Sequence, residues 1–141
     1  MSADQPVYVF DSYAVLAYLG DEPGCGQVRS ILSAAAKGLC RVVMSVINLG
    51  EIAYIVERER GLAPAQAALA ALTLLPVEIV PADRDAVLSA AHVKANHPVT
   101  YADAFAVATA LAFSGAVVTG DPELAAVDDL IPVEWLPRES G

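Results

Sequence analysis

The chain has 141 residues, a formal net charge of -9 and a sequence pI near 4.4. This length predicts one domain over residues 1–141, and the negative charge argues against a generic basic protein that binds nucleic acid by neutralising phosphates. Hydrophobic residues make up 56% of the sequence, yet no apolar run approaches the roughly 18 residues that a membrane span needs. The opening segment MSADQPV lacks the basic and apolar regions of a signal peptide, so we expect a cytoplasmic protein without membrane association.

Short apolar runs alternate with segments of helical spacing along the chain. The runs predict strands at residues 7–10, 39–44, 77–80, 116–119 and 130–136. The segments between them predict helices at residues 14–20, 26–36, 46–60, 64–75, 83–95 and 101–113. This alternation predicts an α/β fold, a three-layer α/β/α sandwich with a mostly parallel central sheet. In such sheets ligands bind outside the carboxyl ends of the strands.

Asp11 directly follows the first predicted strand and therefore lies at a carboxyl end. A local interpretation is equally open, because aspartate is a favoured N-cap for the helix that follows. Asp121 presents the same two possibilities after the strand at residues 116–119. There Pro122 stands at the first helical position, which favours the capping interpretation.

Glu51 belongs to the predicted helix at residues 46–60, about one and a half turns from its start. Leu49, Ala53 and Val56 share one face of this helix, and Glu51 projects from another. The alternative interpretation is that Asn48, Glu51 and Arg58 form the solvated stripe of an amphipathic helix.

Asp103 is the one charged residue in the helix predicted at residues 101–113, which is apolar on nearly every side. That pattern is typical of a buried helix, so we expect the carboxylate to enter the interior. A buried carboxylate without a partner is costly, and a bound cation or a proton would compensate. Capping is again the alternative, because Thr100 and Asp103 form a T-x-x-D box.

Four acids, Asp11, Glu51, Asp103 and Asp121, are thus expected near one edge of the predicted sheet. Like charges held close repel one another unless cations or protons intervene. Carboxylate oxygens with open positions around them suit Mg²⁺ or Mn²⁺. The sequence therefore predicts a divalent metal site, and bound cations would reverse the local negative field.

Four segments carry these acids: VYVFDSYAVLAYL, SVINLGEIAYIV, TYADAFAVATALA and AVVTGDPEL. In order and spacing they resemble the acidic motifs of the PIN domain, and in particular the VapC-type toxins of toxin-antitoxin pairs. The resemblance covers about residues 7–136. It implies acidic positions at Asp11, Glu51, Asp103 and Asp121, with Ser12 and Thr119 as supporting hydroxyls. Asp11 and Asp103 would be direct metal ligands, and the pattern departs from many relatives at Gly120, where those carry a basic or bulkier residue.

By this resemblance the chain is expected to be a Mg²⁺-dependent endoribonuclease, with Mn²⁺ as a possible substitute, that hydrolyses RNA phosphodiesters through metal-activated water. A cognate antitoxin protein would inhibit it. We also expect a homodimer, because the Ala/Leu-rich segment at residues 62–75 has few polar positions for a surface helix.

Three other functions fit parts of the pattern. A non-catalytic PIN-like module would bind RNA or protein, although it gains nothing from four converging carboxylates. A metal-free nuclease would need His92 and His97 as acid and base, and these residues fit an ordinary helix face and a turn. A phospho-receiver domain also has acids at strand ends, but here no lysine follows the strand that ends at Thr119.

Overall fold

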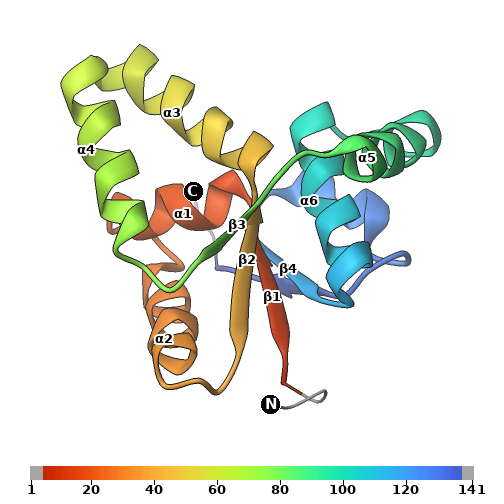
Figure 1. Ribbon diagram of the computed structural model, residues 1–141, viewed down its shortest axis with the longest axis horizontal. Coiled ribbons are helices and arrows are strands. Elements are labelled where there is room, and N and C mark those ends of the chain that lie inside the picture. The colour runs from red at the N-terminus through yellow and green to blue at the C-terminus, as the bar shows by residue number, and fades with distance from the viewer. Residues whose placement is uncertain (1–4, 138–141) are drawn as a thin grey trace.

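The computed structural model describes residues 5–137, and a five-stranded sheet in the order β3-β2-β1-β4-β5 forms its middle layer (Figure 1). Every neighbouring pair of strands is parallel, as expected from the alternation of strands and helices. The strands are β1 (Val7–Phe10), β2 (Arg41–Ser45), β3 (Glu78–Val80), β4 (Ala116–Thr119) and β5 (Val133–Trp135).

Helices cover both faces of this sheet, which confirms the predicted three-layer α/β/α sandwich (Figure 1). The first face carries α1 (Ser12–Leu19), α2 (Cys25–Ala36), α3 (Val46–Arg60) and α4 (Leu62–Thr73). The second face carries α5 (Arg84–Asn96), α6 (Tyr101–Phe113) and the short 3-10 helix η1 (Pro122–Val127).

Alternate side chains of each central strand enter the two apolar layers, because successive residues of a strand point to opposite faces. Val9, Val43 and Val117 pack beneath α5 and α6. Phe10, Met44 and Val118 pack beneath the helices of the first face. A parallel sheet buried on both sides requires such continuous apolar strands, and this explains why the strands were visible in the sequence.

Helix α6 is buried along most of its length, as predicted, and Ala104, Ala106 and Val107 are each 0% exposed. It packs against α5, α3 and the sheet. Small alanine side chains allow this close approach. Thr100 caps the helix by accepting a hydrogen bond from the Asp103 N–H at 3.1 Å, so Asp103 begins a helix that burial holds in place.

Several element boundaries differ from the sequence predictions, and those of the last strand and of α4 have clear physical reasons. The last strand is shorter than residues 130–136, because η1 and a turn precede it and Pro132 has no N–H to donate to a ladder. Helix α4 begins at Leu62 rather than at Pro64, since proline is tolerated in a first turn, where the backbone N–H needs no partner.

Only part of residues 62–75 is free to face a second chain, because Leu72 is 4% exposed and packs in this chain's own core. Leu69 is partly buried against the same cluster. Among the helices of residues 5–137, none is both long enough and apolar enough to cross a membrane.

Candidate metal centre

The candidate site lies at the carboxyl ends of β1 and β4, where the order of the sheet reverses. On one side of β1 lie β2 and then β3, and on its other side lie β4 and then β5. A crevice at such a switch point is where open α/β sheets bind ligands. Phe10 pairs with Val118, so the next residues, Asp11 and Thr119, lie level with each other. Both are buried.

Asp11 is both a helix cap and a buried acid. Its Oδ1 accepts a hydrogen bond from the Ala14 N–H at 2.9 Å, which fixes the start of α1. The pKa of Asp11 is raised from 3.8 to about 7, mainly by burial, and the negative charges of Asp103 and Asp121 act in the same direction. Hydrogen bonds with the Thr119 side chain and the Ala14 backbone act in the opposite direction. Capping alone therefore does not compensate the buried charge.

Asp103 faces the same edge from α6 and is 7% exposed. Burial is the main cause that raises its pKa from 3.8 to about 6, followed by repulsion from Asp121, Glu51 and Glu123. A hydrogen bond with the Thr100 side chain lowers the pKa. Acids from α3 and from the turn after β4 thus all raise the pKa of Asp103.

Asp121 and Glu123 approach Asp103 from the turn after β4. Carboxylate oxygens of these three residues lie within 4.8 Å of one another, a spacing at which one metal ion could be held. The Asp121 N–H donates to Thr119 Oγ1 at 3.0 Å, and Asp121 Oδ1 accepts from the Glu123 N–H at 2.9 Å. These hydrogen bonds shape the turn that brings both acids to Asp103.

Glu123 was absent from the set of residues predicted from the sequence. The available signal was its place in the D-P-E turn, two residues beyond an aspartate that follows a strand. A 3-10 helix begins there, and its tight first turn puts Asp121 and Glu123 on the same side of the chain.

Glu51 reaches this edge from α3 but does not belong to the group of three. Ser12 Oγ donates to Glu51 Oε1 at 2.5 Å, which ties the first residue of α1 to α3. The repulsion that Glu51 exerts on Asp103 places it beside the group. Ile52, the next residue of α3, is fully buried and contributes about 1.5–3 kcal/mol, so it anchors the turn of helix that carries Glu51.

The interpretation of Asn48 as part of a solvated stripe is wrong, because its side chain is 0% exposed. Nδ2 donates to the Ala102 carbonyl at 3.2 Å, so the amide ties α3 to the first turn of α6 beside Asp103. Its Oδ1 is buried without a hydrogen-bond partner among the described residues. Arg58 does lie on the surface of α3, where its guanidinium stacks on the Tyr54 ring.

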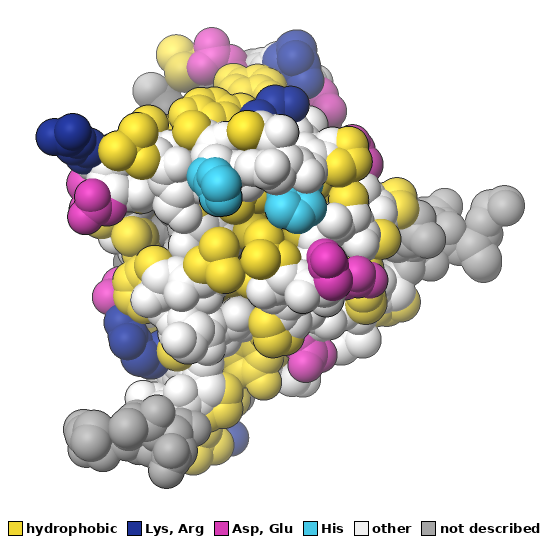
Figure 2. Space-filling model, turned by 90° about the vertical axis from the view of Figure 1, so that its right-hand side faces the viewer, with side chains coloured by type: hydrophobic (Ala, Val, Ile, Leu, Met, Phe, Trp, Pro, Cys, Tyr) yellow, Lys and Arg dark blue, Asp and Glu magenta, His cyan; other side chains and the backbone are white. Residues whose placement is uncertain are grey.

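No cationic side chain of residues 5–137 pairs with these acids. The ion pairs in this part of the chain are Arg29–Asp21 and Arg41–Glu78, both on the surface. The two histidines lie among apolar side chains on the face of α5 and α6 (Figure 2). His92 is exposed, and the His97 ring contacts the Val93 carbonyl at 3.1 Å.

These residues fit a divalent cation. The donors are carboxylate oxygens, which are hard ligands of the kind that Mg²⁺ and Mn²⁺ prefer. Burial and mutual repulsion disfavour the charged forms of Asp11 and Asp103. No cationic side chain of the described residues compensates that charge. Asp103, Asp121 and Glu123 would hold such an ion most directly, with Asp11 and Glu51 adjoining them.

Comparison with solved structures identifies the class of fold. VapBC2 from Rickettsia felis, bound to a DNA fragment from its promoter, superposes with a TM-score of 0.75 at 15% identity, covering 93% of this chain and 99% of that one. VapC20 from Mycobacterium tuberculosis, a toxin that cleaves the sarcin-ricin loop, gives 0.68 at 21% identity, covering 93% and 99%. A toxin-antitoxin complex from Klebsiella pneumoniae gives 0.62 at 16% identity, covering 90% and 95%.

At these identities the solved structures establish a common fold. The sequence model of the PIN domain matches residues 8–130, well over half of the chain. The chain therefore belongs to the PIN domain family. Comparison with curated protein sequences gave no significant match.

The raised pKa values predict how the metal-free protein responds to pH. Asp11 and Asp103 keep their protons up to about pH 7 and pH 6 in the folded state, whereas the unfolded chain releases them near 3.8. The folded state thus binds more protons between these values, so the stability from these groups is complete below pH 4 and is lost as the pH rises to 7. Urea unfolding in EDTA should show wild type losing stability from pH 5 to pH 8 relative to the Asp11→Asn, Asp103→Asn variant. An identical pH dependence in both proteins would contradict this assignment.

Proposed function

We propose that the chain is a Mg²⁺-dependent endoribonuclease, also active with Mn²⁺, and the toxin of a toxin-antitoxin pair that acts in the cytoplasm. The observation that carries the proposal is the pair of buried aspartates, Asp11 and Asp103, whose pKa values are raised and which no cationic side chain of the described residues compensates. Buried, mutually repelling acids destabilise a fold, so their clustering at the carboxyl ends of β1 and β4 is better explained by a bound cation than by capping.

Each side chain of the acidic edge has a role in this proposal. Asp103, Asp121 and Glu123 bind the ion, and Asp11 adds its carboxylate from the end of β1. Thr119 orients Asp11 and the backbone of Asp121 at once. Ser12 holds Glu51 through its hydroxyl, which leaves the second Glu51 oxygen free to accept a proton or a hydrogen bond. The bound ion would supply Lewis acidity toward a phosphodiester and charge stabilisation during its hydrolysis.

RNA is the proposed substrate because a structural neighbour, VapC20, is a toxin that cleaves the sarcin-ricin loop. The net charge of -9 opposes nucleic-acid binding over most of the surface. Bound divalent cations reverse the field locally, so RNA would approach at the metal site and nowhere else on electrostatic grounds. The alternative is a non-catalytic PIN-like module that binds RNA or protein, and an activity assay separates the two.

Asp103→Asn should abolish metal-dependent cleavage while preserving the fold, because it keeps the shape of the side chain and removes a ligand charge. We expect cleavage of structured RNA in Mg²⁺ or Mn²⁺ to fall by more than about a hundredfold, since loss of even an indirect partner of a metal commonly costs 10–100-fold. EDTA should abolish the wild-type activity, and Mn²⁺ should raise the melting temperature of wild type alone.

The matched control is Asp129→Asn, an exposed aspartate in the turn after η1 that contacts none of the site residues. It should cleave RNA as wild type does. Undiminished cleavage in EDTA, or by Asp103→Asn, would refute metal catalysis at this site. A wild type that binds Mn²⁺ and RNA without cleaving it would favour the non-catalytic module.

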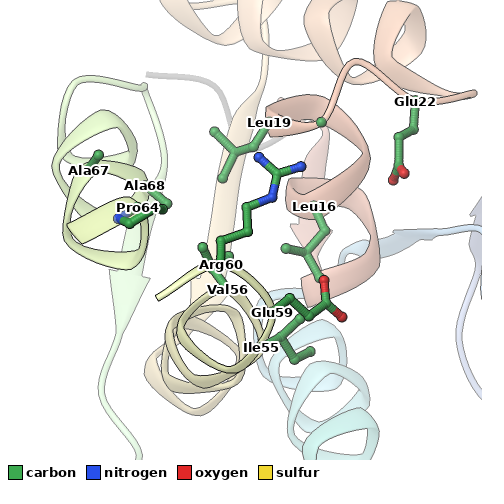
Figure 3. A pocket seen from close by; sticks show the side chains of 11 residues that line it. Leu16, Leu19, Glu22, Ile55, Val56, Glu59, Arg60, Pro64, Ala67 and Ala68 are labelled. Carbon is green, nitrogen blue, oxygen red and sulfur yellow. The ribbon is translucent and has the colours of Figure 1, made fainter. Parts of the chain in front are cut away.

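The proposed antitoxin would dock in a groove between α1 and the α3–α4 pair. The groove has a volume of about 600 Å³, and its apolar lining includes Leu16, Leu19, Val56, Pro64 and Ala67. Figure 3 shows Arg60 lying between the α4 side of the groove and the leucines of α1, with Glu59 below Leu16 and Glu22 farther off, after the end of α1. This combination suits an amphipathic antitoxin helix with an apolar face and basic flanks. Such a partner is proposed because a neighbouring structure is a toxin-antitoxin complex.

Ala67→Glu should weaken antitoxin binding, because it places a long charged side chain in the groove. The protein encoded by the adjacent gene, expressed together with this chain, should copurify with wild type at least tenfold more than with the variant. Ala70→Glu is the control, since Ala70 is exposed on the same helix outside the groove. Equal copurification of the adjacent-gene product with all three proteins would argue against this docking site.

We also propose a homodimer that uses apolar residues left exposed at the two ends of α4. Leu62 is 56% exposed and Leu74 is 86% exposed. Exposed leucines of this size next to a surface helix favour contact with another chain. The buried Leu72 takes no part, because it packs in this chain's own core.

Leu74→Glu should shift the protein from dimer to monomer in light scattering at tens of micromolar, because the added charge would be buried in the contact. Leu88→Glu is the control, since Leu88 is 56% exposed on α5 at the opposite face. A monomeric wild type, or a dimer that both variants leave unchanged, would contradict the proposed interface.

A further inference from the structure

The Tyr13 side chain lies directly against the backbone of Gly120. A Cβ atom at Gly120 would stand 2.6 Å from Cζ of the Tyr13 ring and 2.8 Å from its hydroxyl oxygen. Carbon atoms do not approach this closely, so any side chain at position 120 would displace the ring. The backbone of Gly120 is not in the left-handed region, unlike Gly24 and Gly61. Glycine is therefore required at position 120 because the Tyr13 ring occupies the place of a side chain, and not because of the backbone conformation.

Both partners of this contact are held by residues of the acidic edge. Tyr13 stands between Ser12, which donates to Glu51, and Ala14, whose N–H donates to Asp11. Gly120 stands between Thr119 and Asp121, which a hydrogen bond of 3.0 Å joins. Tyr13 and Gly120 are thus each flanked along the chain by residues of the acidic edge, and their contact holds the tyrosine ring at that edge.

The Tyr13 hydroxyl makes no hydrogen bond with another residue of the described part of the chain, and the side chain is only partly buried. The same edge carries five acids, and no Lys or Arg of residues 5–137 pairs with any of them. An RNA phosphate near the carboxylates can therefore be bound by the proposed metal ion or by a neutral donor. A phenolic O–H can bond a phosphate oxygen without competing with a cation for the acids.

We propose that Tyr13 contacts the substrate, donating a hydrogen bond from its hydroxyl to a phosphodiester oxygen of RNA beside the acidic edge, and that Gly120 provides the space for it. This inference rests on the ribonuclease function proposed above and adds a residue that binds substrate without binding metal. Ionised carboxylates cannot donate a hydrogen bond to a phosphate, whereas the Tyr13 hydroxyl can.

Tyr13→Phe tests the proposal, because it keeps the ring on Gly120 and removes only the hydroxyl. We expect kcat/KM for RNA cleavage to fall about ten- to a hundredfold, the usual effect of losing a hydrogen bond to a charged group. The rise in melting temperature caused by Mn²⁺ should remain as in wild type, since no ligand is lost. Tyr18→Phe, on the same helix and away from Gly120, should leave kcat/KM unchanged.

Gly120→Ala supplies an independent test, because its Cβ displaces the ring that Tyr13→Phe leaves in place. It should also lower kcat/KM, and combining it with Tyr13→Phe should cost less than the product of the two separate losses. Normal kcat/KM in Tyr13→Phe, with an active wild type, would overturn the inference and leave the ribonuclease function standing. A wild type that cleaves no RNA in either metal would overturn both.

Discussion

Parallel pairing of β1 with β4 is the constraint on which the acidic edge depends. The register pairs Tyr8 with Ala116 and Phe10 with Val118, which brings Asp11 level with Thr119. A slip of one residue would turn Val9 and Val117 away from the layer of α5 and α6 and reverse every side chain that follows. Apolar burial on both faces forbids that slip, so packing of valines in the core also determines which polar groups meet at the end of the strands.

Stability and the proposed chemistry make opposing demands at this edge. Burial of Asp11 and Asp103 raises both pKa values, which shows that the fold does not favour their charged forms. Hydrogen bonds offset part of that cost, with the Thr119 side chain and the Ala14 backbone at Asp11 and with the Thr100 side chain at Asp103. Asp11 and Asp121 also begin helices, as the N-caps of α1 and η1, while they belong to the acidic edge. Capping and the proposed metal binding, which look like alternatives in the sequence, are therefore compatible in one side chain.

The sequence was sufficient for the layers of the fold and for the burial of Asp103. Strands buried on both faces read as apolar runs, and α6 reads as a helix with no polar side, so local pattern and tertiary environment agree there. It also led to Asp11 and Asp121 at the carboxyl ends of strands and to Glu51 and Asp103 on helices that begin near the same edge, because parallel topology sends those ends to a single edge.

Residues whose environment depends on distant segments could not be predicted. Asn48 looks solvated in the pattern of α3, yet the first turn of α6 covers it. Glu123 meets Asp103 through a 3-10 turn whose direction follows from two hydrogen bonds rather than from periodicity. Leu72 faces its own core because α3 and α4 pack together over the sheet. The fit of Tyr13 on Gly120 is likewise a contact between helix α1 and the turn after β4.

The acids of this edge come from segments that lie far apart along the chain, since Asp11 follows β1 and Glu123 follows β4. During synthesis, β1 and the start of α1 leave the ribosome long before β4 is made. A nascent chain that ends before β4 can form the cap on Ala14, but it lacks Thr119 and the turn that brings Asp121 and Glu123 to Asp103. The acidic group of this protein therefore cannot assemble during translation until Glu123 has been synthesised and β4 has paired with β1.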